Sequence, residues 1–211
     1  MIYLYSGTPG SGKSLYATYE ILRLLKAKKG VIANFPINLG YFRKKKDKMK
    51  FTFKSNDELS PEFLVSYAKE NHKLNKENQT YIFIDEASIL FNSREWDKKN
   101  RPAWVQFFQL HRKLGFNVVF ICQQDRMLDR QIRAFIETEF KFRSIKNYKT
   151  FGFLLSLFSG GLFVKVEYWY PVRLRCGSQM FRYDKVRARA YDSYMIFQED
   201  TPGGIKAPYP T

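Results

Sequence analysis

The N-terminal residues carry the feature that most constrains the fold. A short apolar run at residues 2–5 leads directly into Gly7-x-x-x-x-Gly12-Lys13-Ser14, and an amphipathic helical pattern follows as far as Gly30. Glycines let such a loop wrap so that successive backbone N–H groups point at a phosphate. The Lys13 ammonium would reach the β- and γ-phosphates, and the Ser14 hydroxyl would ligate Mg²⁺. We therefore predict that the whole loop binds ATP phosphates: Gly7, Thr8, Pro9, Gly10, Ser11, Gly12, Lys13 and Ser14.

Alternation of apolar runs with helical patterns predicts an α/β fold. Residues 31–35, 81–84 and 117–122 are short apolar runs, and helical patterns lie between them at 60–71 and 102–115. A short helix over 127–135 and a strand over 138–145 should follow. This order is typical of a parallel sheet flanked by helices, as in P-loop NTPases. The aromatic stripe beginning at Trp104 then belongs to the core.

Polar residues follow two of the predicted strands at the edge where a nucleotide would lie. Asp85 and Glu86 come directly after residues 81–84. We expect Asp85 to hold the Mg²⁺ shell and Glu86 to deprotonate the attacking water. Gln123 follows the next strand and is the candidate catalytic contact to the terminal phosphate. Gln124 could fill that role instead, and both could equally be solvated turn residues.

The scarce residue types exclude several classes of protein. Two cysteines, Cys122 and Cys176, cannot build a disulfide scaffold, and His72 and His111 lie too far apart for a zinc pattern. We interpret Cys122 as a buried apolar residue and both histidines as surface or helix-face residues. No signal peptide is visible. The most apolar window, residues 151–164, is shorter than the roughly twenty residues of a membrane span. We expect a cytoplasmic protein without a span of its own.

The charge balance favours a polyanionic partner. The chain has 36 Lys and Arg against 20 Asp and Glu, a formal net charge of +16. Residues 141–190 alone contain eleven basic and two acidic residues. Cations alternate with apolar residues there, and aromatic residues lie nearby, which suits single-stranded nucleic acid. A solvated charged face is the alternative. The alternating stretches are Val164-Lys165-Val166, Arg173-Leu174-Arg175 and Lys185-Val186-Arg187-Ala188-Arg189, with Tyr168, Trp169 and Tyr170 beside them.

The pattern along the chain suggests how it is organised. We expect residues 1–150 to form the ATPase core, with a basic surface loop at 43–50. Residues 151–195 would be a basic β-rich extension of the same domain, with antiparallel strands at 162–170 and 172–183. Glycine and proline mark residues 196–211 as a flexible tail. Ring-forming NTPases take an arginine from a neighbouring subunit. The candidates, each of which could be an ordinary surface residue, are Arg101, Arg112, Arg130 and Arg133.

The chain resembles the zonular occludens toxin (Zot) family, which includes the gene I assembly proteins of filamentous phages. The resemblance rests on residues 1–14, on Ile84-Asp85-Glu86-Ala87, on residues 110–119 and on Ile132-Arg133, and it covers roughly residues 1–190. It implies an additional-strand, catalytic-glutamate ATPase in which the Gln123 strand lies between the strands leading to Gly7 and Asp85. It also implies a homo-oligomer that drives extrusion of single-stranded DNA at the inner membrane.

One departure from the family affects the expected partners. Phage members continue into a transmembrane helix and a periplasmic part, and we expect neither in this sequence. We therefore expect membrane recruitment to need an anchored assembly partner or the basic surface, and we do not carry over the toxin activity.

Two alternatives to a DNA motor remain open. A P-loop small-molecule kinase would share the phosphate loop, but Glu86 directly after Asp85 suits a lytic water better than a transferred phosphoryl group. An ATP-switched nucleic-acid-binding module would use the same residues without a motor role.

Overall fold

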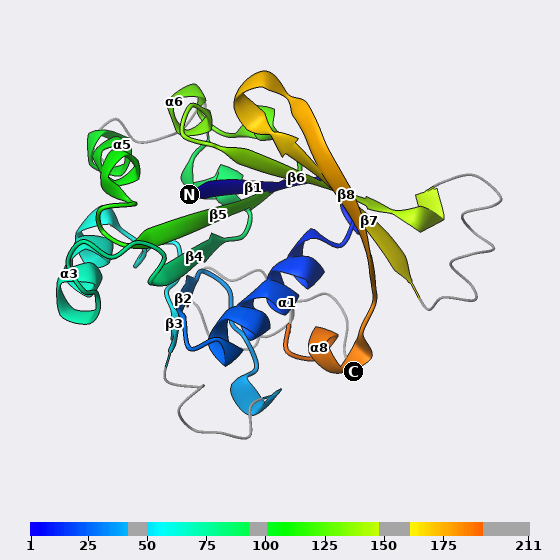
Figure 1. Cartoon of the computed structure of the whole chain (residues 1–211), viewed down its shortest axis with the longest axis horizontal. Coiled ribbons are helices and arrows are strands. Elements are labelled where there is room, and N and C mark those ends of the chain that lie inside the picture. Colours follow the sequence, from blue (N-terminus) through cyan, green and yellow to red (C-terminus); the bar gives the residue numbers. More distant parts are fainter. Residues whose placement is uncertain (42–49, 93–100, 148–160, 192–211) are drawn as a thin grey trace.

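One mixed sheet organises the chain in the computed structural model, which describes residues 1–41, 50–92, 101–147 and 161–191 (Figure 1). The sheet has eight strands in the order β3-β2-β4-β5-β1-β6-β7-β8. The strands are β1 (Ile2–Ser6), β2 (Gly30–Ala33), β3 (Phe51–Phe53), β4 (Thr80–Ile84), β5 (Phe116–Cys122), β6 (Thr138–Ser144), β7 (Leu162–Trp169) and β8 (Leu174–Arg182).

The direction of the strands follows the predicted α/β fold. Every pairing from β3 across to β6 is parallel, whereas β7 pairs antiparallel with both β6 and β8. The parallel sheet and the antiparallel extension are therefore confirmed. Strand β5, which precedes Gln123, lies between β1 and β4, as the family resemblance implies. Because parallel strands all end at one edge, the residues after β1, β4 and β5 meet there.

The helices fill the connections between strands. Ser60 begins one of them as predicted, because its hydroxyl accepts a hydrogen bond from the Phe63 N–H at 3.2 Å. The described helices are α1 (Lys13–Lys26), α3 (Pro61–Asn71), α4 (Ala87–Leu90), α5 (Arg101–Leu110), α6 (Arg130–Arg133) and α8 (Lys185–Ala188), with 3₁₀ turns η1 (Leu39–Tyr41), η2 (Asp125–Met127), η3 (Ile145–Asn147) and η4 (Tyr170–Val172).

Two segments differ from what the sequence pattern suggested, and side-chain capping explains both. The predicted helix over 127–135 is limited to α6, because Leu128 is extended and Asp129 caps the helix by accepting from the Gln131 N–H at 2.8 Å. The alternating stretch 185–189, which we counted with the β-rich extension, forms the helix α8 instead. There the Asp184 carboxylate accepts from the Val186 N–H at 2.9 Å.

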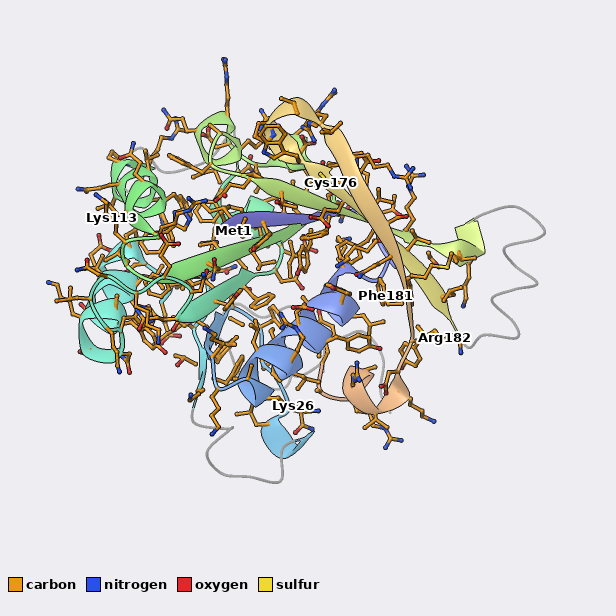
Figure 2. The ribbon with its side chains drawn as sticks, in the orientation of Figure 1. Met1, Lys26, Lys113, Cys176, Phe181 and Arg182 are labelled. Carbon is orange, nitrogen blue, oxygen red and sulfur yellow. The ribbon has the colours of Figure 1, made fainter. Side chains whose placement is uncertain are left out.

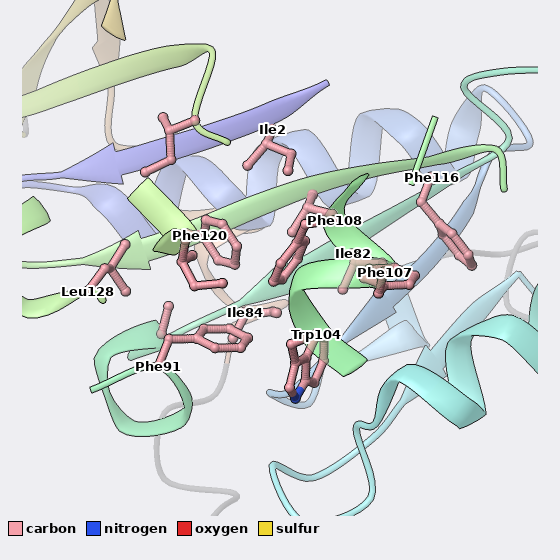
Figure 3. Packing of buried hydrophobic residues seen from close by; sticks show 14 of the residues in the cluster. Ile2, Ile82, Ile84, Phe91, Trp104, Phe107, Phe108, Phe116, Phe120 and Leu128 are labelled. Atoms are coloured by element: carbon pink, nitrogen blue, oxygen red, sulfur yellow. The ribbon is translucent and has the colours of Figure 1, made fainter. Parts of the chain in front are cut away.

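Alternating side chains of the central strands form two cores, one on each face of the sheet. On one face Ile2 and Leu4 of β1 pack with α3 and α5 (Figure 3), and on the other Tyr5 packs with α1. The predicted aromatic stripe lies inside the first core, where the Trp104 and Phe108 rings stack at 5.5 Å. The result is a helix–sheet–helix sandwich with the ends of the parallel strands left open.

Several predictions fall on residues that the structure does not describe. These are the basic loop at 43–49, most of the apolar window at 151–160 and the tail at 196–211. Within the described ranges, every helix is too short or too polar to cross a bilayer.

We expect Phe108→Ala to lower the free energy of unfolding by about 3–5 kcal/mol, because it opens a cavity between aromatic rings. The Phe108 ring lies 5.7 Å from that of Phe91 and 5.5 Å from that of Phe120. The control is Leu74→Ala, since Leu74 is 95% exposed and its loss should change stability by less than about 0.5 kcal/mol. Urea unfolding measures both, and equal losses would contradict the packing.

Candidate nucleotide-binding site

The loop between β1 and α1 has a backbone that requires glycine. Gly7 and Gly12 have φ angles of +148° and +94°, in the left-handed region. A Cβ at Gly7 would lie 2.5 Å from the Phe142 carbonyl oxygen, and one at Gly12 would lie 2.8 Å from the Phe163 ring. Strands β6 and β7 thus press against the loop at both glycines. The sequence pattern predicted the glycines, but not the neighbours that enforce them.

Lys13 lies folded over the loop. Its ammonium donates to the Gly7 carbonyl oxygen at 2.7 Å and to the Thr8 carbonyl oxygen at 3.1 Å. Burial lowers the pKa of Lys13, while the charges of Asp85 and Glu86 raise it in part. Ser11 Oγ is buried here and has no hydrogen-bond partner among the described residues. A phosphate seated in the loop would give both side chains an anionic acceptor at the N-terminus of α1.

Ser14 and Asp85 meet although they belong to different elements. Ser14 Oγ donates to Asp85 Oδ2 at 3.0 Å. Burial raises the pKa of Asp85, and hydrogen bonds from the Glu86 N–H and Ser14 oppose that shift. The Ser14 hydroxyl and the Asp85 carboxylate offer the hard oxygen ligands that Mg²⁺ prefers, and bound Mg²⁺ usually keeps water as its other ligands. The predicted metal residues are therefore adjacent, and their chemistry suits the ion.

Two residues that hold Asp85 escaped the sequence analysis. The Asn34 side chain accepts from the Asp85 N–H at 2.7 Å and donates to its carbonyl oxygen at 2.8 Å, which fixes the backbone on both sides. The Tyr191 hydroxyl lies 3.5 Å from Asp85 Oδ2, and burial raises the pKa of Tyr191 to about 12. A polar residue at the end of the predicted strand 31–35 was the available signal for Asn34.

Glu86 has an unusual backbone for a residue with a side chain. Its φ and ψ are both 46°, in the left-handed region. Its N–H donates to Asp85 Oδ1 at 2.9 Å, and the residue is exposed. Such strained conformations cluster at functional sites, where the surroundings hold them. The turn brings Glu86 out of the strand beside the predicted metal ligands.

Gln123 adjoins the phosphate loop through its backbone. Its carbonyl oxygen accepts from the Gly7 N–H at 3.1 Å. The side chains of Gln123 and Gln124 are both exposed and line a cleft of about 340 Å³ beside Gly7 and Thr8. Either amide can therefore serve the predicted role. Cys122, just before them, is buried as predicted, and burial raises its pKa to about 12.

Other predicted residues have different surroundings from those expected. His111 directly follows α5 and is buried, with Nδ1 2.6 Å from the Phe108 carbonyl oxygen, so its interpretation as a surface or helix-face residue is wrong. Among the arginine candidates, Arg112 pairs with Glu137 at 2.5 Å and Arg101 with Asp129 at 3.3 Å. Arg130 is exposed and Arg133 is half-buried.

Part of the predicted basic surface serves the interior of the protein. Lys165 is buried, and its ammonium donates to the Tyr16 hydroxyl at 2.7 Å, because its position on β7 faces α1. Arg173 pairs with Asp125 and Glu139. Lys165 is therefore not available to a polyanion, and the charge of Arg173, whose side chain is exposed, is balanced by two carboxylates of its own chain. The basic residues of this region that remain exposed on β8 and beyond it include Arg175, Arg182, Lys185 and Arg189.

The sequence matches one protein family and the Gene 1 proteins of several phages. The family described as "Zonular occludens toxin (Zot)" matches residues 1–154. The chain is 30% identical to the Gene 1 protein of Salmonella phage IKe, over 99% of this chain and 60% of that protein. It is 32% identical to the Gene 1 protein of Enterobacteria phage I2-2, over 76% of this chain and 45% of that protein. The chain thus spans about half the length of these relatives.

Solved structures with the same fold include three ATPase-related domains. The N-terminal domain of zonular occludens toxin from Neisseria meningitidis matches with a TM-score of 0.56 and 19% identity, over 90% of this chain and 98% of that one. The ATPase domain of G40P matches with 0.55 and 11%, over 88% and 82%. The genome packaging NTPase B204 of Sulfolobus turreted icosahedral virus 2, solved with ATP-gammaS, matches with 0.53 and 14%, over 86% and 96%. These likenesses show the P-loop NTPase fold. The match of the family model over residues 1–154 establishes that the chain belongs to the zonular occludens toxin family.

Proposed function

We propose that the chain is a Mg²⁺-dependent ATP hydrolase that drives export or packaging of single-stranded DNA during phage assembly. The observation that carries the proposal is the 3.0 Å contact of Ser14 with Asp85 next to the folded Lys13. This contact joins a phosphate loop to a carboxylate at the edge of the sheet, which is what an NTP–Mg²⁺ site requires. The Gene 1 names of the relatives and the packaging role of B204 support the biological setting.

Each candidate residue then has one chemical role. Lys13 and the loop amides bind and orient the phosphates, and Ser14 and Asp85 would hold Mg²⁺, which neutralises phosphate charge when bound. Glu86 accepts the proton of the attacking water. Gln123 contacts the terminal phosphate or that water, and Gln124 is the substitute for it.

The alternatives of the sequence analysis differ in what they do with the terminal phosphate. A kinase would transfer it to a metabolite, and an exposed Glu86 beside Asp85 favours water as the acceptor. An ATP-switched nucleic-acid-binding module would bind ATP and change shape without hydrolysing it. Hydrolysis stimulated by single-stranded DNA, without phosphate transfer to a metabolite, separates the motor from both.

The proposed motor includes a second copy of the chain and a membrane partner. Arg101 and Arg112 contact carboxylates of their own chain, so Arg130 or Arg133 is the better candidate for an arginine given to a neighbour in a homo-oligomer. We also propose a cytoplasmic location at the inner face of the membrane, reached through an anchored assembly partner. The core at 1–150 would act there with the basic extension at 151–195 and the tail at 196–211.

We expect Glu86→Gln to bind ATP normally and to hydrolyse it about 100 to 10,000 times more slowly, because the amide cannot accept a proton from water. Calorimetry gives the affinity and phosphate release gives the rate. Glu70→Gln, at an exposed position on α3, is the matched control and should keep full activity. A rate loss below about tenfold would exclude Glu86 as the general base.

We expect neutralising Arg175, Arg182, Lys185 and Arg189 together to flatten the salt dependence of single-stranded DNA binding. Each phosphate contact contributes about −0.7 to the slope of log affinity against log salt, so the slope should change by up to about 3. Fluorescence anisotropy with a labelled oligonucleotide at several salt concentrations measures it.

The matched control neutralises four exposed lysines on the α3 and α5 side, namely Lys69, Lys73, Lys76 and Lys113. Figure 2 shows Lys113 at the opposite side of the molecule from Arg182. An equal change in slope for both sets would mean that the attraction comes from net charge and not from this surface.

A further inference from the structure

Arg173 differs from the other basic residues of the extension in what it contacts. It follows the turn η4 between β7 and β8, and its guanidinium lies between two carboxylates. One nitrogen donates to Asp125 Oδ2 at 2.5 Å, and the other donates to Glu139 Oε2 at 2.8 Å. The guanidinium also lies 4.0 Å from the centre of the Tyr170 ring. Its charge is therefore balanced within the chain.

The Glu139 end of this bridge reaches the start of the phosphate loop. Glu139 is only 2% exposed, and its Oε1 accepts from the Ser6 hydroxyl at 2.5 Å. Ser6 is the last residue of β1 and directly precedes Gly7. A buried carboxylate is strongly destabilised when it loses its cation. Arg173 thus supports the strand end from which the loop begins.

The Asp125 end of the bridge reaches the residues after β5. Asp125 begins η2, two positions beyond Gln123. Burial pushes its pKa upward, but hydrogen bonds from Arg173 and Tyr170 outweigh burial and keep the pKa of Asp125 below its ordinary value. The carboxylate therefore stays charged and bound. The segment Gln123-Gln124 is therefore held on one side by the hydrogen bond between Gly7 and Gln123, and on the other by the contact of the next residue, Asp125, with Arg173.

The backbone of Arg173 supports a positioning role. Its φ angle of +56° is in the left-handed region, which a residue with a side chain adopts at a cost. Its guanidinium contacts Asp125 and Glu139, which line the same cleft as Gln123 and Gln124. Arg175, two residues on, instead donates to Ser178 Oγ within its own hairpin at 3.3 Å.

We propose that Arg173 is a positioning residue for ATP turnover, which holds the Gln123-Gln124 segment against the phosphate loop through Asp125 and Glu139. This inference rests on the proposed hydrolysis of ATP. One guanidinium then sets the distance between the loop that binds the phosphates and the amide that meets the terminal phosphate. Arg173 belongs to the turn of the β7–β8 hairpin. A partner that moves this turn would therefore also move the Gln123 amide, through the contact of Arg173 with Asp125.

The test compares kcat and KM for ATP in purified variants of the full chain. Arg173→Gln should lower kcat by about tenfold to a hundredfold, because a displacement of about 1 Å at a reacting centre has this effect. KM for ATP should change by less than about threefold, since the phosphate loop itself is intact. Arg173→Lys keeps the charge but cannot donate to both carboxylates in the same geometry, so its kcat should lie between those of the wild type and Arg173→Gln.

A second variant covers the case in which Arg173→Gln does not fold. Asp125→Asn cuts the same bridge from the other end and leaves the Arg173–Glu139 pair in place. It should show the same loss of kcat with little change in melting temperature, and the double variant should lose no more than Arg173→Gln alone. The matched control is Arg23→Gln, which removes an exposed arginine paired with Glu20 at 2.7 Å on α1 and should keep the wild-type kcat.

Three results would overturn the inference. The first is a kcat within about twofold of wild type in both Arg173→Gln and Asp125→Asn, which is smaller than a lost positioning contact gives. The second is a rise of KM at constant kcat. The third is a flattened salt dependence of DNA binding in Arg173→Gln, because this would make Arg173 a nucleic-acid contact. A wild-type protein that does not hydrolyse ATP would overturn the proposed function itself, whereas an active wild type with equally active variants overturns only the role of Arg173.

Discussion

The contact between Ser14 and Asp85 is the constraint on which the rest of the site depends. These residues are 71 positions apart in the sequence, and they meet because β1 and β4 run parallel on either side of β5. All the groups proposed to handle the phosphates therefore leave the sheet at one edge. Asn34 then fixes the backbone of Asp85 through two hydrogen bonds. Without that parallel order the phosphate loop would lack its carboxylate.

The antiparallel strands shape this site as much as the parallel ones do. Phe163 of β7 lies against Gly12, and Phe181 of β8 packs on Tyr16 with ring centres 5.1 Å apart. Lys165 of β7 donates a hydrogen bond to the hydroxyl of the same Tyr16, which belongs to α1. The β7–β8 hairpin thus packs against α1, the helix that begins at the phosphate loop. The extension that the sequence marked as a basic surface of the same domain therefore also supports the candidate nucleotide site.

The features of the fold and the site that depend on local sequence patterns could be predicted from the sequence. Glycine spacing, apolar runs and the Asp85-Glu86 pair identified the loop, the strands and the fold, and the parallel order brought Ser14 to Asp85. The roles of Lys165 and Arg173 depend on which strand faces which neighbour, and alternation alone could not show that Tyr16 and Glu139 lie opposite them. The left-handed turn at Glu86 has no sequence signal, since glycine is the usual residue there.

The most direct test of the central claim is a double-mutant cycle on Mg²⁺-ATP binding with Ser14→Ala, Asp85→Ala and the double variant. If both residues serve one metal site, their effects on affinity are not additive, and the coupling should be about 0.5–3 kcal/mol. Each loss should also vanish when Mg²⁺ is replaced by chelator. Losses that add, or that persist without Mg²⁺, would contradict the account.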